Sequence, residues 1–457
     1  MTPSSTGPER LTGVTAIILA AGVGSRMHAA QPKVLHPLLG RPMALWVVEA
    51  VRSVLRDPAL LLLSPATAAL HALAPTGTLR AEQPEPRGTG DAVRCALPAL
   101  SADATEVLIA CGDTPLLEPS SISALIATRR AAGAPIALAA FHAEDPTGYG
   151  RVELSEEGRA VRIVEERDAT DEGRANDLVN AGLYAVDRAW LTGALETLAP
   201  SAASGEVYLT DLVARAAAEG TPAPVLLGSG IDLEGVNDRR QFADAAAALR
   251  ERINAAHLER GVGMMDPTTV WIEPTVSIAA DVVIEPNVML SGNTTIATGT
   301  RIEAGSRIHE SVIGEGCTIR SSDIDGSTLA SGVDVGPFAH IRPGCTIGAS
   351  AHVGNFAELK ATTLSAKVKV GHHSYLGDTS VGEGSNIGAG TITANYDGEK
   401  KHATVIGARV FTGVGTLIVA PLTMGDGSKS GAGAVVLKDV PAGALVVGVP
   451  ARTIGKE

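Results

Sequence analysis

A glycine-rich segment followed by two cationic side chains is the first group of residues that could do chemistry. Gly22 and Gly24 follow an apolar run that ends at Ala20, and Arg26 and Lys33 come next. A glycine loop between a strand and a helix lets backbone N–H groups approach phosphates closely, and the start of the helix adds a favourable field. Two glycines alone are more typical of a structural turn. With both cations present, the pattern predicts a phosphate-binding loop.

A carboxylate stands at the end of a second apolar run. Asp113 follows Cys111 and Gly112, directly after the run 106–110. Magnesium prefers oxygen ligands and shares them with phosphates, so a carboxylate beside a phosphate loop is a natural ligand for Mg²⁺. A helix cap or a turn is the more usual role of an isolated aspartate. Beside the glycine loop, we predict that Asp113 binds the metal ion.

A second set of chemical side chains lies far along the chain. Arg342 and Lys360 are 18 residues apart. His372 follows 12 residues after Lys360, and Tyr375 comes three residues later. If the chain closes one coil every 18 residues, Arg342 and Lys360 meet as a cationic pair that suits a phosphate. A neutral imidazole beside that pair can act as a general base. The alternative for His372, a surface histidine on a turn, is disfavoured by these neighbours.

The element that would bring these residues together is a coil with flat sides. Between Val276 and Val436 an aliphatic residue recurs every six positions, most clearly at Ile278, Ile284, Leu290, Ile296, Ile302 and Ile308, and again at Ile341, Ile347, Val353 and Leu359. Neither a helix nor an isolated strand has this period. Three such segments per coil predict a triangular β-solenoid around one apolar column. A disordered glycine-rich tail, the alternative, lacks a regular apolar beat.

Two further features belong to the solenoid. Glycine follows the aliphatic residue at several places, namely Gly314, Gly348, Gly354, Gly371 and Gly388. We expect these glycines at corners where the backbone would strain other residues. Between 393 and 404 the six-residue beat fails, which predicts a loop that leaves the solenoid at a binding face.

The chain before the repeats alternates apolar runs with helical segments. The runs lie at 14–20, 59–63, 106–110, 135–141 and 178–186, and the helical segments at 43–55, 90–100 and 119–132. This alternation predicts a Rossmann-like α/β domain, with a mostly parallel sheet covered on both faces. Such sheets bind ligands beyond the carboxyl ends of their strands, so the loops after Ala20 and Ala110 are the expected site. We predict domains at 1–239 and 261–457, joined by a helical linker at 240–260.

Composition limits the classes of function. The net charge of -13 argues against a nucleic-acid surface. The four cysteines form no CxxC motif and are expected to be free thiols in a reducing compartment. Residues 1–13 are polar and show no signal peptide, and no apolar stretch approaches the roughly 20 residues of a membrane span. A large, soluble, cytoplasmic protein of two or three domains is therefore expected.

Several motifs, taken together and in this order, resemble one family closely. They are LAAGVGSRM (19–27), PKVLHPLLGRPM (32–43), AEQ (81–83) with GTG (88–90), GD (112–113), DPTGYGR (145–151), IVEERDAT (163–170), EGVND (234–238), GHHSYLGD (371–378) and GAGTITANYDG (388–398). The resemblance is to the bifunctional bacterial uridyltransferase/acetyltransferases that make UDP-N-acetylglucosamine, and it runs from Val14 to Pro450. It implies a nucleotidyltransferase domain followed by a left-handed parallel β-helix of hexapeptide repeats.

The resemblance implies that the first domain joins N-acetylglucosamine-1-phosphate to UTP and releases pyrophosphate. The nucleoside would be held by Leu19, Ala20, Ala21, Gly22, Gln83, Gly88 and Thr89. Arg26 would act in catalysis and, with Lys33, hold the triphosphate, while Asp113 and Asn237 would coordinate Mg²⁺. The sugar would be held by Gly150, Glu165 and Asn180. Ala181 stands where the family has a threonine, which bears on sugar affinity.

The resemblance also implies that the β-helix acetylates glucosamine-1-phosphate with acetyl-CoA, with His372 as the base. Substrate residues would be Arg342, Lys360, Tyr375, Asn386, Asn395 and Tyr396, and the coenzyme groove would include Ala389, Val414, Ala432 and Gly448. Val414 and Gly448 stand where the family has serine and arginine, and these two differences bear on coenzyme affinity. The family is a homotrimer whose acetyl sites draw on neighbouring subunits.

Two other functions compete with this one. A nucleotidyltransferase for another sugar could use the solenoid only for assembly or regulation, but an inert coil has no need of Arg342, Lys360 and His372. A non-catalytic binding scaffold gives no reason for Arg26, Lys33 and Asp113 to converge.

Overall fold

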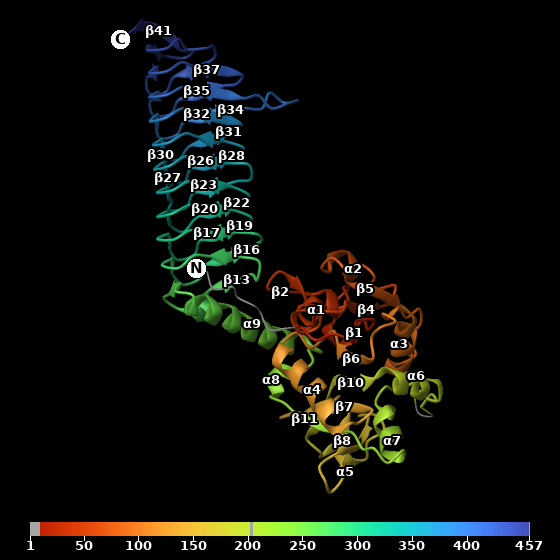
Figure 1. Cartoon of the computed structure of the whole chain (residues 1–457). Coiled ribbons are helices and arrows are strands. Elements are labelled where there is room, and N and C mark those ends of the chain that lie inside the picture. The colour runs from red at the N-terminus through yellow and green to blue at the C-terminus, as the bar shows by residue number, and fades with distance from the viewer. Residues whose placement is uncertain (1–9, 202–203, 457) are drawn as a thin grey trace. The chain divides into compact units, whose positions relative to one another are not determined.

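The computed structural model describes residues 10–201 and 204–456 (Figure 1). The chain divides into two compact units, Met1–Ala248 and Leu249–Glu457. The expectation that residues 1–13 hold no signal peptide falls largely on residues 1–9, which lie outside the described residues.

A twisted sheet forms the centre of the first unit. Its main path is β11 (Val225–Leu227), β7 (Ile136–His142), β10 (Leu178–Asp187), β6 (Glu106–Cys111), β1 (Val14–Leu19), β4 (Ala59–Leu63) and β5 (Leu79–Glu82). Off this path, β8 (Arg151–Leu154) pairs with β10, and β9 (Ala160–Val164) pairs with β8. The pairs β1–β4, β1–β6, β4–β5 and β7–β11 are parallel, whereas β10 runs antiparallel to β6 and β7. The predicted strands are confirmed to within one or two residues.

Helices cover both faces of this sheet. On one face are α1 (Met43–Val54), α2 (Leu70–Leu73), α4 (Pro119–Ala132) and α8 (Gly230–Leu233), and on the other are α3 (Thr89–Ala96), α6 (Arg188–Glu196) and α7 (Asp211–Ala218). The remaining helices are α5 (Asp171–Arg174) and α9 (Arg239–Glu259). Because successive side chains of a strand point to opposite faces, Ala16 and Ile18 of β1 join one apolar cluster and Ile17 joins another. Burial on both faces explains why β1 and β4 are continuous apolar runs.

The second unit is a left-handed parallel β-helix, as predicted. Its three long sheets run from β12 (Gly263–Met264) to β33 (Asn386–Ile387), from β13 (Trp271–Ile272) to β39 (Val435–Val436) and from β14 (Ser277–Ile278) to β37 (Leu422–Met424). A short sheet with β40 (Ala444–Val447) and β41 (Arg452–Lys456) follows. The rungs stack one above another in Figure 1. Each rung strand has two to four residues.

The six-residue beat becomes one continuous apolar column. Ile284 pairs with Ile302, and Ile302 with Ile319, in successive coils, and all three are fully buried. Buried hydroxyls reinforce the stacking, since Ser327 Oγ accepts a hydrogen bond from the backbone N–H of Cys345 in the next coil, and Ser311 Oγ does so from Ser327. The column and the hydroxyls together hold the coils in register.

The glycines after the aliphatic residues serve a different purpose from the one expected. None of the five lies in the left-handed region of backbone space. Instead, a Cβ at Gly354 would stand 2.0 Å from the carbonyl oxygen of Gly371, and one at Gly388 would stand 2.3 Å from that of Thr412. The prediction of strained corners was therefore wrong. Four of these glycines are needed because the next coil approaches closely, while a Cβ at Gly371 would meet nothing within 4 Å.

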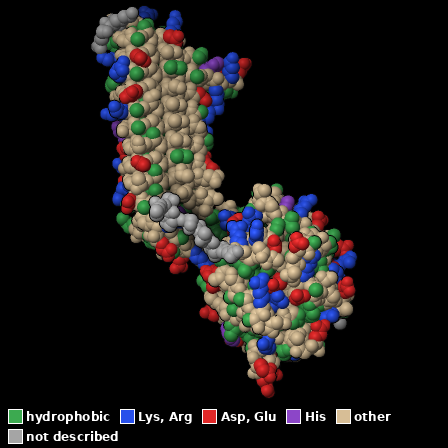
Figure 2. Space-filling view, in the orientation of Figure 1, with side chains coloured by type: hydrophobic (Ala, Val, Ile, Leu, Met, Phe, Trp, Pro, Cys, Tyr) green, Lys and Arg blue, Asp and Glu red, His purple; other side chains and the backbone are tan. Residues whose placement is uncertain are grey.

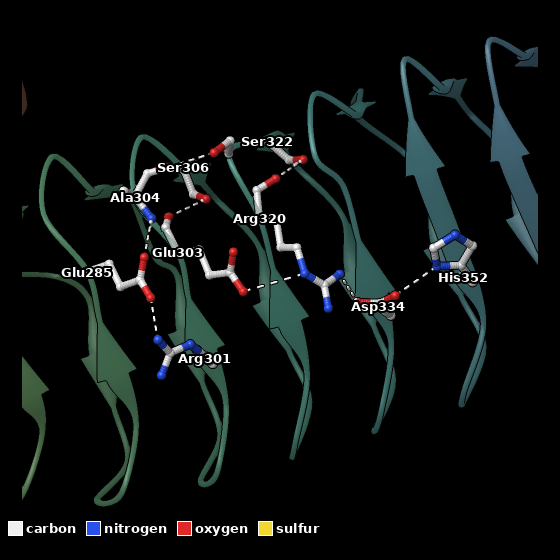
Figure 3. A network of polar contacts seen from close by, with 10 residues as sticks. Glu285, Arg301, Glu303, Ala304, Ser306, Arg320, Ser322, Asp334 and His352 are labelled. Carbon is white, nitrogen blue, oxygen red and sulfur yellow. Dashed lines mark hydrogen bonds and ion pairs between the residues drawn. The ribbon is translucent and has the colours of Figure 1, made fainter.

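Ion pairs run along one outer face of the β-helix from coil to coil (Figure 3). Arg320 contacts Glu303 at 3.4 Å and also Asp334, and Asp334 accepts from His352 Nδ1 at 2.8 Å. Exposed ion pairs contribute about 0–1 kcal/mol each, so the buried column supplies most of the stability.

The carboxyl-terminal half of α9 covers the first coil. Asn254 Nδ2 donates to the carbonyl oxygens of Pro267 at 2.8 Å and Val270 at 2.9 Å. Ile253 packs against the apolar column, and the Arg250 guanidinium lies over the Trp271 ring. The helix thus shields the end of a core that would otherwise meet water.

Substitution of Gly354 by Ala is predicted to destabilise the β-helix by about 2 kcal/mol or more, because the new methyl group collides with the backbone of the next coil. The matched control is Gly371→Ala, which adds the same group to open space and should change the free energy of unfolding by less than about 0.5 kcal/mol. Urea unfolding followed by circular dichroism measures both. Equal effects of the two substitutions would contradict this account of the glycines.

Stability should also depend on pH through His257. Burial, with the Arg260 cation beside it, lowers the pKa of His257 to about 4. The unfolded chain therefore takes up a proton first as the pH falls below about 6.5, and the folded state loses stability on the order of 2 kcal/mol between pH 7 and pH 5. In His257→Gln, the difference in urea midpoint between these two pH values should shrink. An unchanged difference would exclude His257 as its source.

Candidate active sites

The first site lies at one edge of the sheet in the first unit. Leu19, the last residue of β1, pairs with Cys111, the last residue of β6, in parallel register. The glycine loop after β1 and the carboxylate after β6 therefore leave the sheet side by side. This is the edge at which the sequence predicted ligand binding.

Both cations converge on the predicted metal ligands. Lys33 Nζ forms an ion pair with Asp113 and lies 3.1 Å from Asn237 Oδ1. Arg26 donates to the same Asn237 oxygen at 3.0 Å. Gly24 makes this possible, because a Cβ there would stand 2.7 Å from the Lys33 side chain.

The oxygens of Asp113 and Asn237 fit a magnesium ion. Both already contact one cation, the Lys33 ammonium. No group of three or more His, Cys, Asp and Glu side chains among the described residues could hold a metal. Magnesium suits such a sparse protein site, because it keeps several waters and takes further ligands from substrate phosphates.

Beside these groups lies a cavity of about 210 Å³. It brings together seven of the predicted residues, namely Leu19, Thr89, Asp113, Gly150, Glu165, Asn180 and Asn237. It is also lined by Tyr149, Tyr184 and Thr210, which sequence reasoning missed. Ala20, Ala21 and Gly22 stand on the loop after β1 and do not line this cavity. Cys111 lines it too, and burial raises the pKa of its thiol to about 12, which keeps it neutral.

The predicted sugar residues are held by the side chains that sequence reasoning missed. Burial raises the pKa of the Glu165 carboxyl, and a hydrogen bond donated by Thr210 at 2.7 Å opposes that shift. Asn180 donates to the Tyr184 hydroxyl at 2.6 Å and accepts from the backbone N–H of Gly182 at 3.1 Å. These polar groups are thus fixed in place before any ligand arrives.

The predicted base-reading residues surround the start of α3. Gln83 is buried, and its Nε2 donates to the carbonyl oxygen of Gly88 at 3.1 Å. Thr89 Oγ1 accepts from the backbone N–H of Leu209 at 3.0 Å. Gly88 has a φ of 102°, and a Cβ there would stand 2.5 Å from the carbonyl oxygen of Val207. A distant segment therefore holds this loop.

The second site lies on the β-helix, where Arg342 and Lys360 stand at equivalent positions of consecutive coils. Leu359 pairs with Ile341, and Arg342 N donates to Leu359 O at 2.8 Å. Each cation meets its own carboxylate. Arg342 contacts Glu358 at 2.9 Å, and Lys360 contacts Asp378 at 3.9 Å.

His372 is oriented by the coil below it. It pairs with Asn355 across the sheet, and its Nδ1 lies 2.7 Å from Asn355 Oδ1. With that oxygen as acceptor, Nδ1 carries the proton and Nε2 keeps a free lone pair, which is the form a general base needs. Tyr375 pairs with Glu358 in the coil below. Asn386 forms a parallel bridge to Phe411 in the next coil of the same face.

An arm leaves the β-helix after β34 (Ile392–Ala394), where the beat was predicted to fail (Figure 1). Asn395 Nδ2 donates to Asp378 at 2.5 Å, and Tyr396 donates its hydroxyl to the carbonyl oxygen of Gly398. The nearby Lys360 ammonium lowers the pKa of Lys401, which places a third cation, missed in the sequence, at this site. Lys401 belongs to an irregular loop, so no spacing rule could have found it.

The predicted coenzyme residues follow one another along successive coils. Gly415 N donates to Ala389 O at 2.7 Å, Gly433 N to Val414 O at 2.8 Å, and Val435 N to Gly448 O at 3.1 Å. Ala432 immediately precedes Gly433. Val414 is largely exposed, and Gly448 has a φ of 94°.

All four cysteines are free. In the described residues, no helix has the length and apolar character that crossing a bilayer requires.

Comparison with known proteins identifies the family. Residues 16–226 match the MobA-like NTP transferase domain. The chain is 42% identical to the bifunctional protein GlmU of Pelobacter propionicus, with 96% of each chain covered. It is 43% identical to that of Sorangium cellulosum (96% of this chain, 94% of the relative) and 40% identical to that of Mycolicibacterium gilvum (97% and 91%).

A nucleotidyltransferase domain followed by a β-helix with its own cationic site defines the class as a two-domain transferase. The chain belongs to the GlmU family of bifunctional proteins. This confirms the family that the motifs resemble, the uridyltransferase/acetyltransferases of UDP-N-acetylglucosamine synthesis.

Proposed function

We propose that the chain makes UDP-N-acetylglucosamine in two steps at two separate sites. Residues 261–457 transfer acetyl from acetyl-CoA to glucosamine-1-phosphate. Residues 1–239 then join the product to UTP, and residues 240–260 connect the two domains. The observation that carries the proposal is that each unit holds its own group of cations, one beside oxygen ligands and one beside an oriented imidazole. The cytoplasm is the proposed location.

In acetyl transfer, Arg342 and Lys360 bind the phosphate of the sugar, which replaces Glu358 and Asp378 as their partners. The amine of the sugar attacks the thioester carbonyl carbon, and the thiolate of coenzyme A leaves. His372 Nε2 takes the proton that the amine loses, while Asn355 holds the ring in the required tautomer. Tyr375, Asn386, Asn395 and Tyr396 position the sugar and the acetyl group.

In uridyl transfer, the phosphate oxygen of the sugar attacks the α-phosphorus of UTP, and pyrophosphate leaves. Both reactants are anions, so catalysis consists mainly of charge neutralisation and alignment. Arg26 and Lys33 supply the positive charge that the protein brings to this site. Gly150, Glu165 and Asn180 orient the sugar. Asp113 and Asn237 would hold Mg²⁺, which neutralises phosphate charge when it is bound.

Two substitutions should separate the activities. With glucosamine-1-phosphate, acetyl-CoA, UTP and Mg²⁺ supplied together, thiol release reports acetyl transfer. With N-acetylglucosamine-1-phosphate supplied directly, pyrophosphate release reports uridyl transfer. We expect His372→Ala to lower thiol release at least about 100-fold, because the general base is lost. Asp113→Ala should lower pyrophosphate release by a similar factor.

The control for the first substitution is His373→Ala, which removes a neighbouring imidazole that stacks on Phe356 instead of facing Asn355. Thiol release should stay within about twofold in this variant. Loss of both activities in either single variant would contradict separate sites. Loss of thiol release in His373→Ala would mean that His373, and not His372, is the general base.

We further propose that three chains associate through the faces of the β-helix. Figure 2 shows hydrophobic side chains scattered over the visible face of this unit. Met289, Val405 and Phe411 are each 46–47% exposed and belong to three different sheets, so each face of the β-helix carries an apolar side chain that a neighbouring chain could cover. Sedimentation equilibrium should give three times the chain mass of 46.5 kDa. A stable monomer that transfers acetyl would refute this assembly.

A further inference from the structure

The carboxamide of Gln83 has a fixed orientation that follows from its neighbours. Its Nε2 lies 3.1 Å from the carbonyl oxygen of Gly88 and 3.0 Å from Asp91 Oδ2. A carbonyl and a carboxylate can only accept hydrogen bonds, so the NH₂ group must face them. Gln83 is only 5% exposed, which leaves no water to compensate the opposite orientation.

The carbonyl oxygen of Gln83 is consequently the atom left for a ligand. Within the described part of the chain, Gln83 Oε1 accepts no hydrogen bond. This oxygen is not fully buried, so it reaches the surface of the protein. A partly buried acceptor without a partner suits a ligand that carries an N–H group.

Asp91 also contacts a cationic side chain. Its other oxygen, Oδ1, lies 3.9 Å from Arg94 one helical turn later, and the Arg94 guanidinium is anchored to the carbonyl oxygen of Leu195 at 2.8 Å. A carboxylate in this position cannot donate, so it never supports a reversed Gln83. An amide or a hydroxyl could support either orientation.

We propose that Asp91 is a positioning residue that, together with the Gly88 carbonyl, locks Gln83 and thereby contributes to the choice of nucleobase. Uracil carries an N–H group at N3, and the fixed Gln83 oxygen can accept a hydrogen bond from it. Cytosine presents an acceptor at N3 and would meet that oxygen with two lone pairs opposed. This inference rests on the proposed function, namely that Gln83 faces the base of UTP. Asp91 itself touches no substrate and acts through Gln83.

The test is the ratio of kcat/KM for UTP to that for CTP in Asp91→Asn, measured by pyrophosphate release with N-acetylglucosamine-1-phosphate. The new amide can donate to a reversed Gln83 and leaves the Gly88 carbonyl as the remaining contact that favours the original orientation, so we expect the ratio to fall about threefold or more. The ratio of UTP to 5-methyl-UTP should not change, because both bases carry the N3 hydrogen. Asp91→Ser, whose hydroxyl both donates and accepts, should shift the UTP to CTP ratio in the same direction.

A matched control is Glu85→Gln, the same loss of charge on the neighbouring loop. Glu85 pairs with the exposed Arg87 and does not contact Gln83, so the UTP to CTP ratio should stay at the wild-type value. Equal losses for UTP and CTP in both Asp91 variants would mean that Asp91 is merely structural, and would overturn the inference. If the wild-type chain releases no pyrophosphate from UTP, the proposed function fails first, which is a different result.

Discussion

The in-register stacking of the β-helix coils is the constraint on which the second unit depends. Each rung is a strand of only two to four residues, so no single strand could hold its own register. Register is set by the apolar column and by buried hydroxyls that bond to the next coil. A slip of one residue would turn the column outward, which makes the register strongly specified. Residues about 18 apart in sequence therefore become neighbours.

The proposed acetyl site is a direct product of this register. Arg342 and Lys360 lie one coil apart, Glu358 lies beside Tyr375, and Asn355 lies beside His372. The cations of this site, Arg342 and Lys360, each form an ion pair with a carboxylate. Lys33 does the same with Asp113 in the first unit. An anionic ligand can replace those carboxylates without leaving a buried charge unpaired. Both proposed sites therefore use the same exchange of partners.

Much of the fold could be predicted because its signals are local. The runs at β4 and α4 match the structure to the residue, since continuous burial, a proline at the helix start and a glycine at its end all lie within the segment. The role of Gly354 could not be predicted, because the atoms that exclude a side chain belong to the next coil. Thr210 and Glu358 were missed for the same reason, since each joins a site through a contact with another segment of the chain. Tyr184 lies on the same strand as its partner Asn180, but its burial in the first unit gave no sign in the sequence that its hydroxyl holds a site residue.

The most direct measurement is a crystal structure with glucosamine-1-phosphate bound. It should place the phosphate oxygens within hydrogen-bonding distance of both Arg342 and Lys360, with the Glu358 and Asp378 carboxylates displaced from them. A phosphate bound elsewhere, with both of those ion pairs still intact, would contradict the proposal that stacked coils build the site and that the ligand takes over its cations.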